Sequence, residues 1–317
     1  MANIMLSPES KSLMYKEFVG SLVCPPKPGH VFVIAGVTKE FAQRLDIDFL
    51  TSSEDYETRI FHVSIRFDEC IIINNTKLDK TWGTGERWDH GLESGGKFRI
   101  YVLAMRDEFH ISFDNAVHAV YKYKASLNDI KAIRVCKDIR YVTQFDHRMV
   151  YPTAYPYLQW YDDKNWIFSH NVPQKFIAGD VMLLKAIALE NPKGSFNLVF
   201  YEGASNKHAL TFNVDFGKKV VTRDSMDNEL KVINVEQDGG FPFSMDKEFK
   251  LAIGFTKTQF VIVVDGKKFC TYNYTSPNQL ELLCAFHMKV KDGLLLNVGN
   301  IKHKHSASEN CEGIEKF

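Results

Sequence analysis

Residues 61–87, FHVSIRFDECIIINNTKLDKTWGTGER, contain the pattern that decides the fold. Between positions 61 and 67, apolar side chains alternate strictly with His62, Ser64 and Arg66, and such alternation indicates a strand with one buried face. Asp68 and Glu69 then make a short reversal, and the β-branched residues of 70–75 predict a return strand. The stretch therefore predicts a β-hairpin that carries a row of polar side chains on one face.

The polar row is joined by further side chains from the same stretch. The return strand brings Asn75 into the neighbourhood, and residues 81–87 add an indole, a carboxylate and a guanidinium. A sugar needs this mixture, because its hydroxyls require paired donors and acceptors and its C–H face requires an aromatic platform. The residues of this candidate carbohydrate site are His62, Ser64, Arg66, Asn75, Trp82, Glu86 and Arg87.

The same stretch resembles the carbohydrate-recognition signature of the galectins, which reads H-x-N-P-R, then V-x-N, then W-x-x-E-x-R. His62, Arg66, Asn75, Trp82 and Arg87 stand in matching places. The resemblance implies a β-sandwich lectin that binds β-galactosides. In that reading His62 and Arg66 contact an axial ring hydroxyl, Asn75 takes a neighbouring exocyclic hydroxyl, and Trp82 stacks on the apolar face of galactose.

Three positions depart from the family pattern. Ser64 replaces the asparagine, Ile65 replaces the proline, and Gly85 occupies the glutamate position with Glu86 one residue later. A slip of one residue turns a strand side chain to the opposite face. Glu86 is therefore expected to serve the site only if the segment around Gly83 and Gly85 forms a bulge that re-aims it.

Composition excludes several other classes of protein. The 39 basic and 39 acidic residues cancel, so no net field favours nucleic acid or an anionic membrane. No apolar run has the length of a membrane span, and residues 1–18 lack the pattern of a secretory signal. The six cysteines have neither metal-site nor disulfide spacing, which favours reduced thiols in the cytosol. We expect a cytoplasmic protein without metal or cofactor, and the resemblance adds export to the extracellular space without a signal peptide.

Short strands at even spacing predict an all-β sandwich or jelly roll. Beyond the central hairpin we expect strands within 18–37 and at 44–49, 97–104, 109–113, 116–123 and 130–143, with Asp114 and Asn115 as a hairpin turn. Residues 1–17 are interpreted as a polar lead, and no segment predicts an amphipathic helix of convincing length.

An internal repeat indicates that the chain contains two copies of this fold. Phe98 and Phe249 lie 249 − 98 = 151 residues apart, and the same offset relates Tyr121 to Tyr272 and Tyr123 to Tyr274. We therefore predict two tandem β-sandwich (jelly-roll, galectin-like) domains. The first spans 18–145, residues 146–165 form a linker and leading strand, and the second spans 166–305.

The second copy keeps the core pattern but changes the polar row. At an offset of 149, His62 becomes Thr211, Arg66 becomes Asp215 and Asn75 becomes Asp224, and no tryptophan lies near the position of Trp82. A carboxylate in place of a guanidinium removes donors and reverses the local charge. We therefore predict that the second domain does not bind β-galactosides in the usual way.

Three functions compete for this pattern. The first is a lectin without catalysis, whose partners are β-galactoside-containing glycans or glycoproteins, with homo-oligomer formation left open. The second is a glycoside hydrolase, which needs two carboxylates flanking the scissile bond, whereas the polar row supplies only Glu86. The third is a protein-interaction module that has kept the sandwich and lost sugar binding. The lectin is the interpretation we favour.

Overall fold

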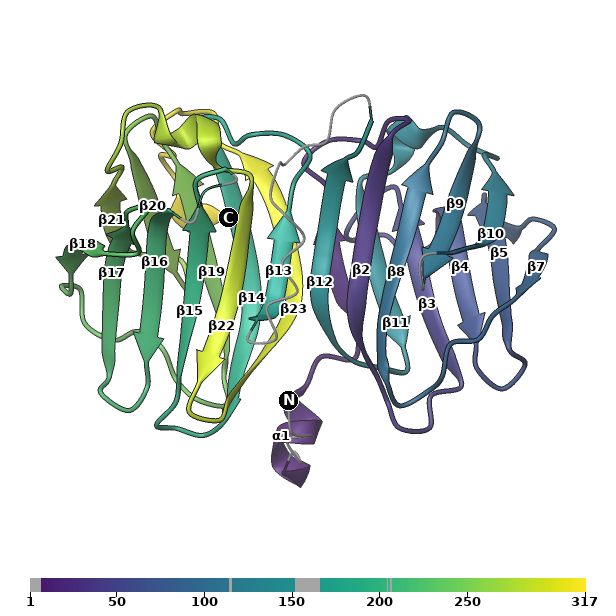
Figure 1. Cartoon of the computed structure of the whole chain (residues 1–317), viewed down its shortest axis with the longest axis horizontal. Helices are drawn as coiled ribbons and strands as arrows, with labels where there is room; N and C mark the ends of the chain where they lie inside the picture. Colours follow the sequence, from purple (N-terminus) through teal and green to yellow (C-terminus); the bar gives the residue numbers. More distant parts are fainter. Residues whose placement is uncertain (1–6, 114–115, 152–165, 204, 206) are drawn as a thin grey trace. The chain divides into compact units, whose positions relative to one another are not determined.

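A computed structural model describes residues 7–113, 116–151, 166–203, 205 and 207–317. The described residues form two compact units (Figure 1). The N-unit contains those between positions 15 and 155, and the C-unit contains those of 156–317 together with residues 7–14. The expected hairpin turn at Asp114 and Asn115 lies outside the described residues.

The N-unit is built from two antiparallel sheets. The site sheet has the strand order β1-β11-β3-β4-β5-β6, with β7 also paired to β5, and the back sheet has the order β10-β9-β8-β2-β12. The strands are β1 (Phe18–Ser21), β2 (His30–Thr38), β3 (Arg44–Leu50), β4 (Arg59–Arg66), β5 (Ile71–Leu78), β6 (Thr81–Trp82), β7 (Glu86–Asp89), β8 (Lys97–Ala104), β9 (Glu108–Phe113), β10 (Ala116–Lys122), β11 (Ala132–Lys137) and β12 (Ile139–Met149), with one 3₁₀ turn, η1 (Leu127–Asp129).

The core of the N-unit fixes which face of β4 is free for a site. Phe61, Val63 and Ile65 are fully buried, as the alternation predicts. The Phe61 ring stacks on Phe109 of the back sheet at 4.5 Å and on Tyr121 at 5.2 Å between ring centroids. Burial of such large apolar side chains provides most of the driving force for packing two sheets together. The alternating polar residues must then lie on the other face of the site sheet, which we call the site face.

The C-unit repeats this architecture. One sheet has the order β13-β22-β15-β16-β17-β18 and the other β21-β20-β19-β14-β23. Its elements are α1 (Pro8–Leu13), β13 (Trp166–Asn171), β14 (Asp180–Glu190), β15 (Ser195–Tyr201), β16 (His208–Asp215), β17 (Val220–Met226), β18 (Val232–Glu236), β19 (Glu248–Phe255), β20 (Gln259–Val264), β21 (Lys267–Asn273), η2 (Gln279–Leu282), β22 (Ala285–Lys291), β23 (Leu294–His305) and η3 (Ile314–Lys316).

Equivalent contacts in the two units confirm the repeat. The Tyr121 hydroxyl lies 2.9 Å from Thr76 Oγ1, and the Tyr272 hydroxyl donates to Ser225 Oγ at 3.0 Å. Each tyrosine thus joins the two sheets of its unit through a buried hydroxyl pair, where an unpaired hydroxyl would be costly. The predicted fold class, all-β with two sandwich domains, is therefore confirmed.

Three segments differ from the sequence expectation. Residues 8–13 of the expected polar lead form α1, because the Ser7 side chain caps the helix by accepting from Ser10 N and Pro8 occupies its first turn. β12 continues to Met149, which pairs with His30, so the expected linker at 146–165 begins inside a strand. Its residues 152–165 lie outside the described part of the chain.

The third difference is at the other end of the C-unit. Residues beyond 305, the expected boundary, pack on the outer face of the sheet that contains β14, β19 and β20. Glycine at position 254 makes room for this segment, because a Cβ there would lie 2.8 Å from Ile314 Cδ1. The apolar cluster consists of Val181, Leu183, Ala252, Val261, Val263, Cys311 and Ile314, with Phe317 packed against it.

Asn74 on β5 gives a first stability prediction. Its side chain is fully buried, and neither Nδ2 nor Oδ1 has a hydrogen-bond partner among the described residues. An unsatisfied buried polar group costs about 1–3 kcal/mol. Asn74→Leu, which keeps the branched shape, should raise the free energy of unfolding of the N-unit by about that amount in urea titrations. The matched control is Asn75→Leu, since Asn75 is half-buried and hydrogen-bonded. Equal effects of the two substitutions would contradict this reasoning.

Candidate functional site

Three neighbouring strands place the candidate residues on one face. In the antiparallel register His62 of β4 lies opposite Asn75 of β5 and opposite Asp48 of β3. Two residues along, Ser64 lies between Ile73 and Asp46 in the same way. Residues opposite each other in such a ladder point to the same face. The structure therefore brings His62, Ser64 and Asn75 together, as the sequence predicted.

His62 is held by a buried carboxylate. Its Nδ1 lies 2.6 Å from Oδ1 of Asp48, which is 1% exposed. The same carboxylate is approached by Arg59 Nε at 3.3 Å and by Arg134 Nη1 at 3.6 Å, and Arg134 is itself held by Glu17. A carboxylate on Nδ1 fixes the orientation of an imidazole and the proton on that nitrogen. Nε2 is then the ring nitrogen left to meet a ligand.

Trp82 supplies an accessible aromatic surface beside His62. Its side chain is 41% exposed, and its ring centroid lies 4.9 Å from that of His62. The guanidinium carbon of Arg59 lies 5.0 Å from the indole centroid, and Lys77 Nζ lies 5.9 Å from it. Cations at this distance attract the ring electrostatically and help to fix its orientation. The indole is therefore held at the surface and not turned into the core.

Short polar contacts orient Arg66 and the loop that carries Trp82. Arg66 Nε donates to Ser64 Oγ at 3.0 Å, and Arg66 Nη1 lies 3.6 Å from Glu69 Oε1. Asn75 Nδ2 donates to the Gly83 carbonyl at 3.1 Å. Ser64 thus positions a guanidinium on the site face, and Asn75 ties the loop to β5.

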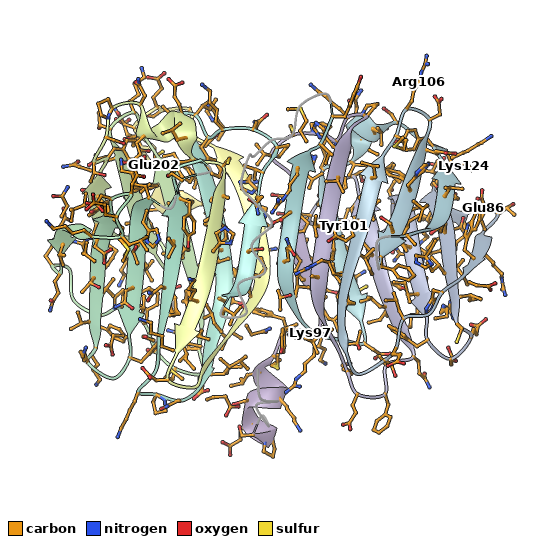
Figure 2. All side chains as sticks on the ribbon, viewed as in Figure 1. Glu86, Lys97, Tyr101, Arg106, Lys124 and Glu202 are labelled. Atoms are coloured by element: carbon orange, nitrogen blue, oxygen red, sulfur yellow. The ribbon has the colours of Figure 1, made fainter. Side chains whose placement is uncertain are left out.

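The two last candidates of the stretch lie on opposite faces of β7. Arg87 pairs with Ile73 and so lies on the site face, where its Nη1 is 3.9 Å from Glu69 Oε2. Glu86 pairs with Asn74, whose side chain is buried on the other face, and its carboxylate lies 3.8 Å from Lys124 Nζ (Figure 2). The segment between Trp82 and Glu86 does contain one extra residue relative to β5, since Trp82 pairs with Lys77 and Glu86 with Asn74, but this shift turns Arg87 and not Glu86 to the site face. Glu86 is therefore not brought to the site.

Gly85 occupies the place on the site face that Glu86 does not reach. A Cβ at Gly85 would lie 3.3 Å from Ile73 Cγ2 and 3.5 Å from Asn75 Nδ2, and both of those side chains lie on the site face. This glycine has no positive φ that would exclude other residues. The position can therefore accept a side chain after a small movement of Ile73.

Sequence reasoning missed the residues of β3 that form the floor of the site. Arg44, Asp46 and Asp48 alternate with apolar residues and lie opposite Arg66, Ser64 and His62. Arg44 Nε donates to Asp46 Oδ1 at 2.7 Å. The signal was present in RLDIDFL at 44–50, where alternation already places these polar residues on one face. What the sequence did not reveal is that β3 pairs with β4.

The equivalent face of the C-unit has different chemistry. Thr211 lies opposite Asp224 and Asn213 opposite Thr222, so the replaced residues are brought together there. Burial raises the pKa of Asp224 above its usual range. At the edge of that sheet, where the N-unit has Trp82, the aliphatic side chains of Leu230 and Val232 are exposed.

The described residues contain neither a metal-binding cluster nor a membrane-spanning helix. In the part of the chain that is described, no three His, Cys, Asp or Glu side chains are grouped so that they could hold a metal ion. None of its helices has the length and apolar character needed to cross a membrane.

Comparisons with known proteins identify the family of this chain. The sequence profile of the family described as galactoside-binding lectin matches residues 17–147 and again 167–291. A 32 kDa beta-galactoside-binding lectin of Haemonchus contortus is 26% identical over 80% of this chain and 86% of its own length. A protein of the same description from Caenorhabditis elegans is 24% identical over 78% and 83%. The crystal structure of chicken galectin 2 aligns with 41% of this chain and 97% of its own, at 20% identity and a TM-score of 0.37. With both of its halves matched by one profile, the chain belongs to the family of galactoside-binding lectins, or galectins.

Proposed function

We propose that this protein binds β-galactoside-containing glycans through the site face of the N-unit. The observation that carries the proposal is the exposed indole of Trp82 beside His62, on the face where Ser64, Arg66 and Asn75 gather. An aromatic platform next to several hydrogen-bonding side chains matches the two surfaces of a galactose ring.

Each side chain has a defined role in this proposal. Trp82 stacks on the apolar face of the ring, and His62 Nε2 and Arg66 meet the axial hydroxyl. Asn75 meets the exocyclic hydroxyl, and Arg87 lies at the rim. Each hydrogen bond to the sugar replaces one to water, so the net gain per contact is small and a single site binds weakly.

The family binds carbohydrate and is not one of enzymes, and the N-unit site favours the same conclusion for this chain. Two carboxylates on the site face, Asp46 and Asp48, were overlooked in the sequence, and their presence reopens the question of glycoside hydrolysis. Both are held in ion pairs, Asp46 with Arg44, and Asp48 with His62 and two arginines. A general acid or nucleophile needs a carboxylate oxygen that is free for the glycosidic bond, whereas these two carboxylates are engaged by the cationic and imidazole side chains around them.

The C-unit is proposed to contribute no β-galactoside site. Its equivalent face carries Thr211, Asp215 and Asp224 in place of an imidazole, a guanidinium and an amide, and exposed aliphatic side chains in place of the indole. A calorimetric titration of the whole chain with lactose is then expected to give one site per chain. Two equivalent sites would overturn this assignment, and such a pair would allow avidity for multivalent glycans.

The six cysteines support a cytosolic origin. None of the six is joined in a disulfide, and four are buried. Proteins of oxidising compartments commonly join such residues in disulfides. We therefore propose synthesis in the cytoplasm, with export to the extracellular glycans by a route that uses no signal peptide.

Lactose titrations of two tryptophan variants test the binding proposal. Trp82→Ala removes the stacking platform, which is worth about 1–3 kcal/mol, and should weaken lactose binding by at least about tenfold. The matched control is Trp88→Ala, because Trp88 pairs with the buried Ile72 and so lies on the opposite side of β7 from Arg87. Binding that survives Trp82→Ala, or that is lost equally in both variants, would refute the assigned site.

A substitution at Gly85 should improve the site. Gly85→Glu places a carboxylate beside Asn75 and on the side of Arg87, where it can hold a guanidinium and accept a sugar hydroxyl. A charge-assisted hydrogen bond contributes about 1.5–3 kcal/mol, so lactose affinity should rise by about tenfold in the same calorimetric titration. The control Gly85→Gln has the same shape without charge and should gain less. No gain with glutamate would mean that the backbone at 85 holds the side chain away from the ligand.

A further inference from the structure

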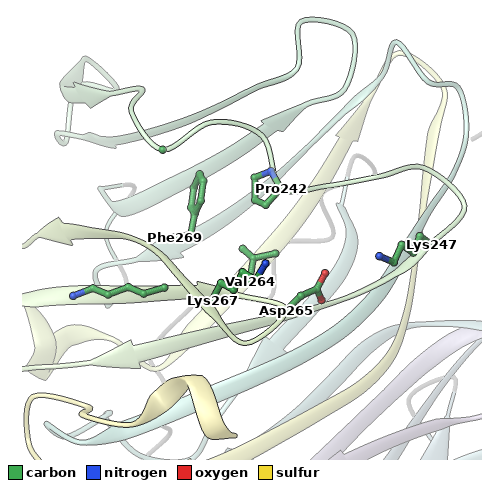
Figure 3. A pocket seen from close by; sticks show the side chains of 8 residues that line it. Pro242, Lys247, Val264, Asp265, Lys267 and Phe269 are labelled. Atoms are coloured by element: carbon green, nitrogen blue, oxygen red, sulfur yellow. The ribbon is translucent and has the colours of Figure 1, made fainter.

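A pocket of the C-unit lies away from the face that corresponds to the sugar site. Its volume is about 510 Å³, which falls within the range of small-ligand pockets. It sits at the hairpin between β20 and β21, under the loop that carries Pro242 (Figure 3). The lining residues are Gly239, Pro242, Lys247, Val264, Asp265, Lys267, Lys268 and Phe269.

The apolar wall of this pocket is built by a bulge and a glycine. Ile262 pairs with Cys270 and Val263 with Lys268, so Phe269 is the extra residue of a β-bulge, a feature that re-aims side chains. Gly239 has a φ of +105°, and a Cβ there would lie 3.0 Å from Phe269 Cε2. The loop can approach the ring this closely only because residue 239 is a glycine.

The rim of the pocket is basic. Lys247, Lys267 and Lys268 are exposed, and no ion pair involving any of them is found among the described residues. Asp265 is the one carboxylate of the lining, and its Oδ1 already accepts the backbone N–H of Lys250 at 2.8 Å. The pocket therefore has an excess of positive charge that the described part of the protein leaves uncompensated.

The N-unit shows that the fold does not require these lysines. At the offset of 151, Lys247, Lys267 and Lys268 correspond to Gly96, Ala116 and Val117. The bulge itself is shared, because the pairing of β10 with β9 shifts between Val117 and Ala119 in the same way. Both units thus contain the β-bulge, and only in the C-unit is the bulge surrounded by lysine side chains.

We propose that this pocket binds a sugar ring that carries a sulfate or phosphate ester. Phe269 and Pro242 pack against the ring, and Lys247 and Lys267 meet the ester oxygens, while Lys268, which leaves β21 on the opposite face from Lys267, adds to the positive field around the pocket. Ammonium groups bind such anions as point charges, and their attraction falls with added salt. This site is separate from the galactoside site of the N-unit and does not depend on it.

Titrations of the intact chain with four probes test the proposal. The readout is the NMR chemical shifts of residues in β20 and β21. Glucose 6-sulfate and glucose 6-phosphate should both bind, with the stronger of the two identifying the natural ester, and both should weaken as salt is raised. Glucose and sodium sulfate should each bind at least about tenfold more weakly than the esters. If glucose binds as well as the esters, or sulfate alone does, the proposal fails.

Two triple variants with the same change in net charge distinguish specific binding in the pocket from general electrostatic attraction to the protein. Lys247→Ala/Lys267→Ala/Lys268→Ala should weaken ester binding by at least about tenfold. The control Lys193→Ala/Lys218→Ala/Lys291→Ala lies outside the pocket, at two turns and at the end of β22, and should change ester binding less than about twofold. Equal loss in both variants would overturn the proposal. Lactose binding should be unchanged in both, so failure here is distinguishable from failure of the galactoside site.

Discussion

Asp48→Asn should weaken lactose binding by at least about tenfold and lower the free energy of unfolding of the N-unit by about 3–5 kcal/mol. Asp48 is almost fully buried, and three cationic or hydrogen-bonding groups converge on its carboxylate from His62, Arg59 and Arg134. Removing the negative charge leaves two guanidinium groups without their shared buried partner, and this is the costly way to break an ion-pair network.

The loss of binding has a separate cause from the loss of stability. The Asp48 carboxylate holds the proton on His62 Nδ1 and so presents Nε2 toward the ligand, while its contact with Arg59 keeps the guanidinium near Trp82. Asparagine can present its amide N–H₂ to His62 instead, which would reverse the tautomer. Imidazole ¹⁵N shifts of His62 report this change directly, and a purely structural role for Asp48 would leave them unaltered.

Asp46→Asn is the matched control for this experiment. Asp46 is also buried on β3 and ion-paired, with Arg44 Nε at 2.7 Å, but it lies opposite Ser64 and not His62. It should cost stability without changing the His62 shifts. Equal effects of the two variants on lactose affinity would show that any carboxylate of the floor serves the site, and that Asp48 has no special positioning role.

Local alternation predicted the faces of strands well but could not reveal partners across strands. The pattern of 61–67 placed Phe61 and Val63 in the core and His62 on the site face, because a strand has a period of two whatever lies beside it. Asp48 is 14 residues from His62, and its contact depends on the register of β3 against β4. No periodicity within one strand encodes that register.

The orientation of Glu86 likewise depends on strand register, which the local sequence does not encode. The sequence identified that its position was shifted by one residue, and the outcome depended on whether a bulge formed nearby. One extra residue does lie between Trp82 and Glu86, but it brings Gly85 and Arg87 to the site face and leaves Glu86 near Lys124. The helix at 8–13 was predictable in principle, since Ser7-Pro8 is a helix-start signal, but its hydrogen bond to Glu190 was not.

Acid should destabilise both units, because each contains a histidine kept neutral by its surroundings. Burial, assisted by Lys27, lowers the pKa of His30 to about 4, and burial, assisted by Lys289, lowers the pKa of His208 to about 4. His30 Nδ1 lies 2.8 Å from His147 Nε2, a contact that one shared proton satisfies and a second proton would disrupt.

The sign follows from proton binding in the two states. Above pH of about 6.5 neither state protonates these rings, so their contribution to stability is fully present. As pH falls from about 6.5 toward 4, the unfolded chain binds protons that the folded units do not, and stability is lost. Each histidine should remove about 2–3 kcal/mol between pH 7 and pH 4.5, measured from urea midpoints of the two unfolding transitions.

Single substitutions assign this loss to particular residues. His30→Gln retains a side-chain amide that can bond to His147 and should flatten the pH dependence of the N-unit transition alone, by about 2–3 kcal/mol. His118→Gln is the control, because His118 stacks on Phe113 in the same unit and makes no contact with the His30 pair. If His30→Gln leaves the pH slope of the N-unit unchanged, the acid sensitivity arises from other groups.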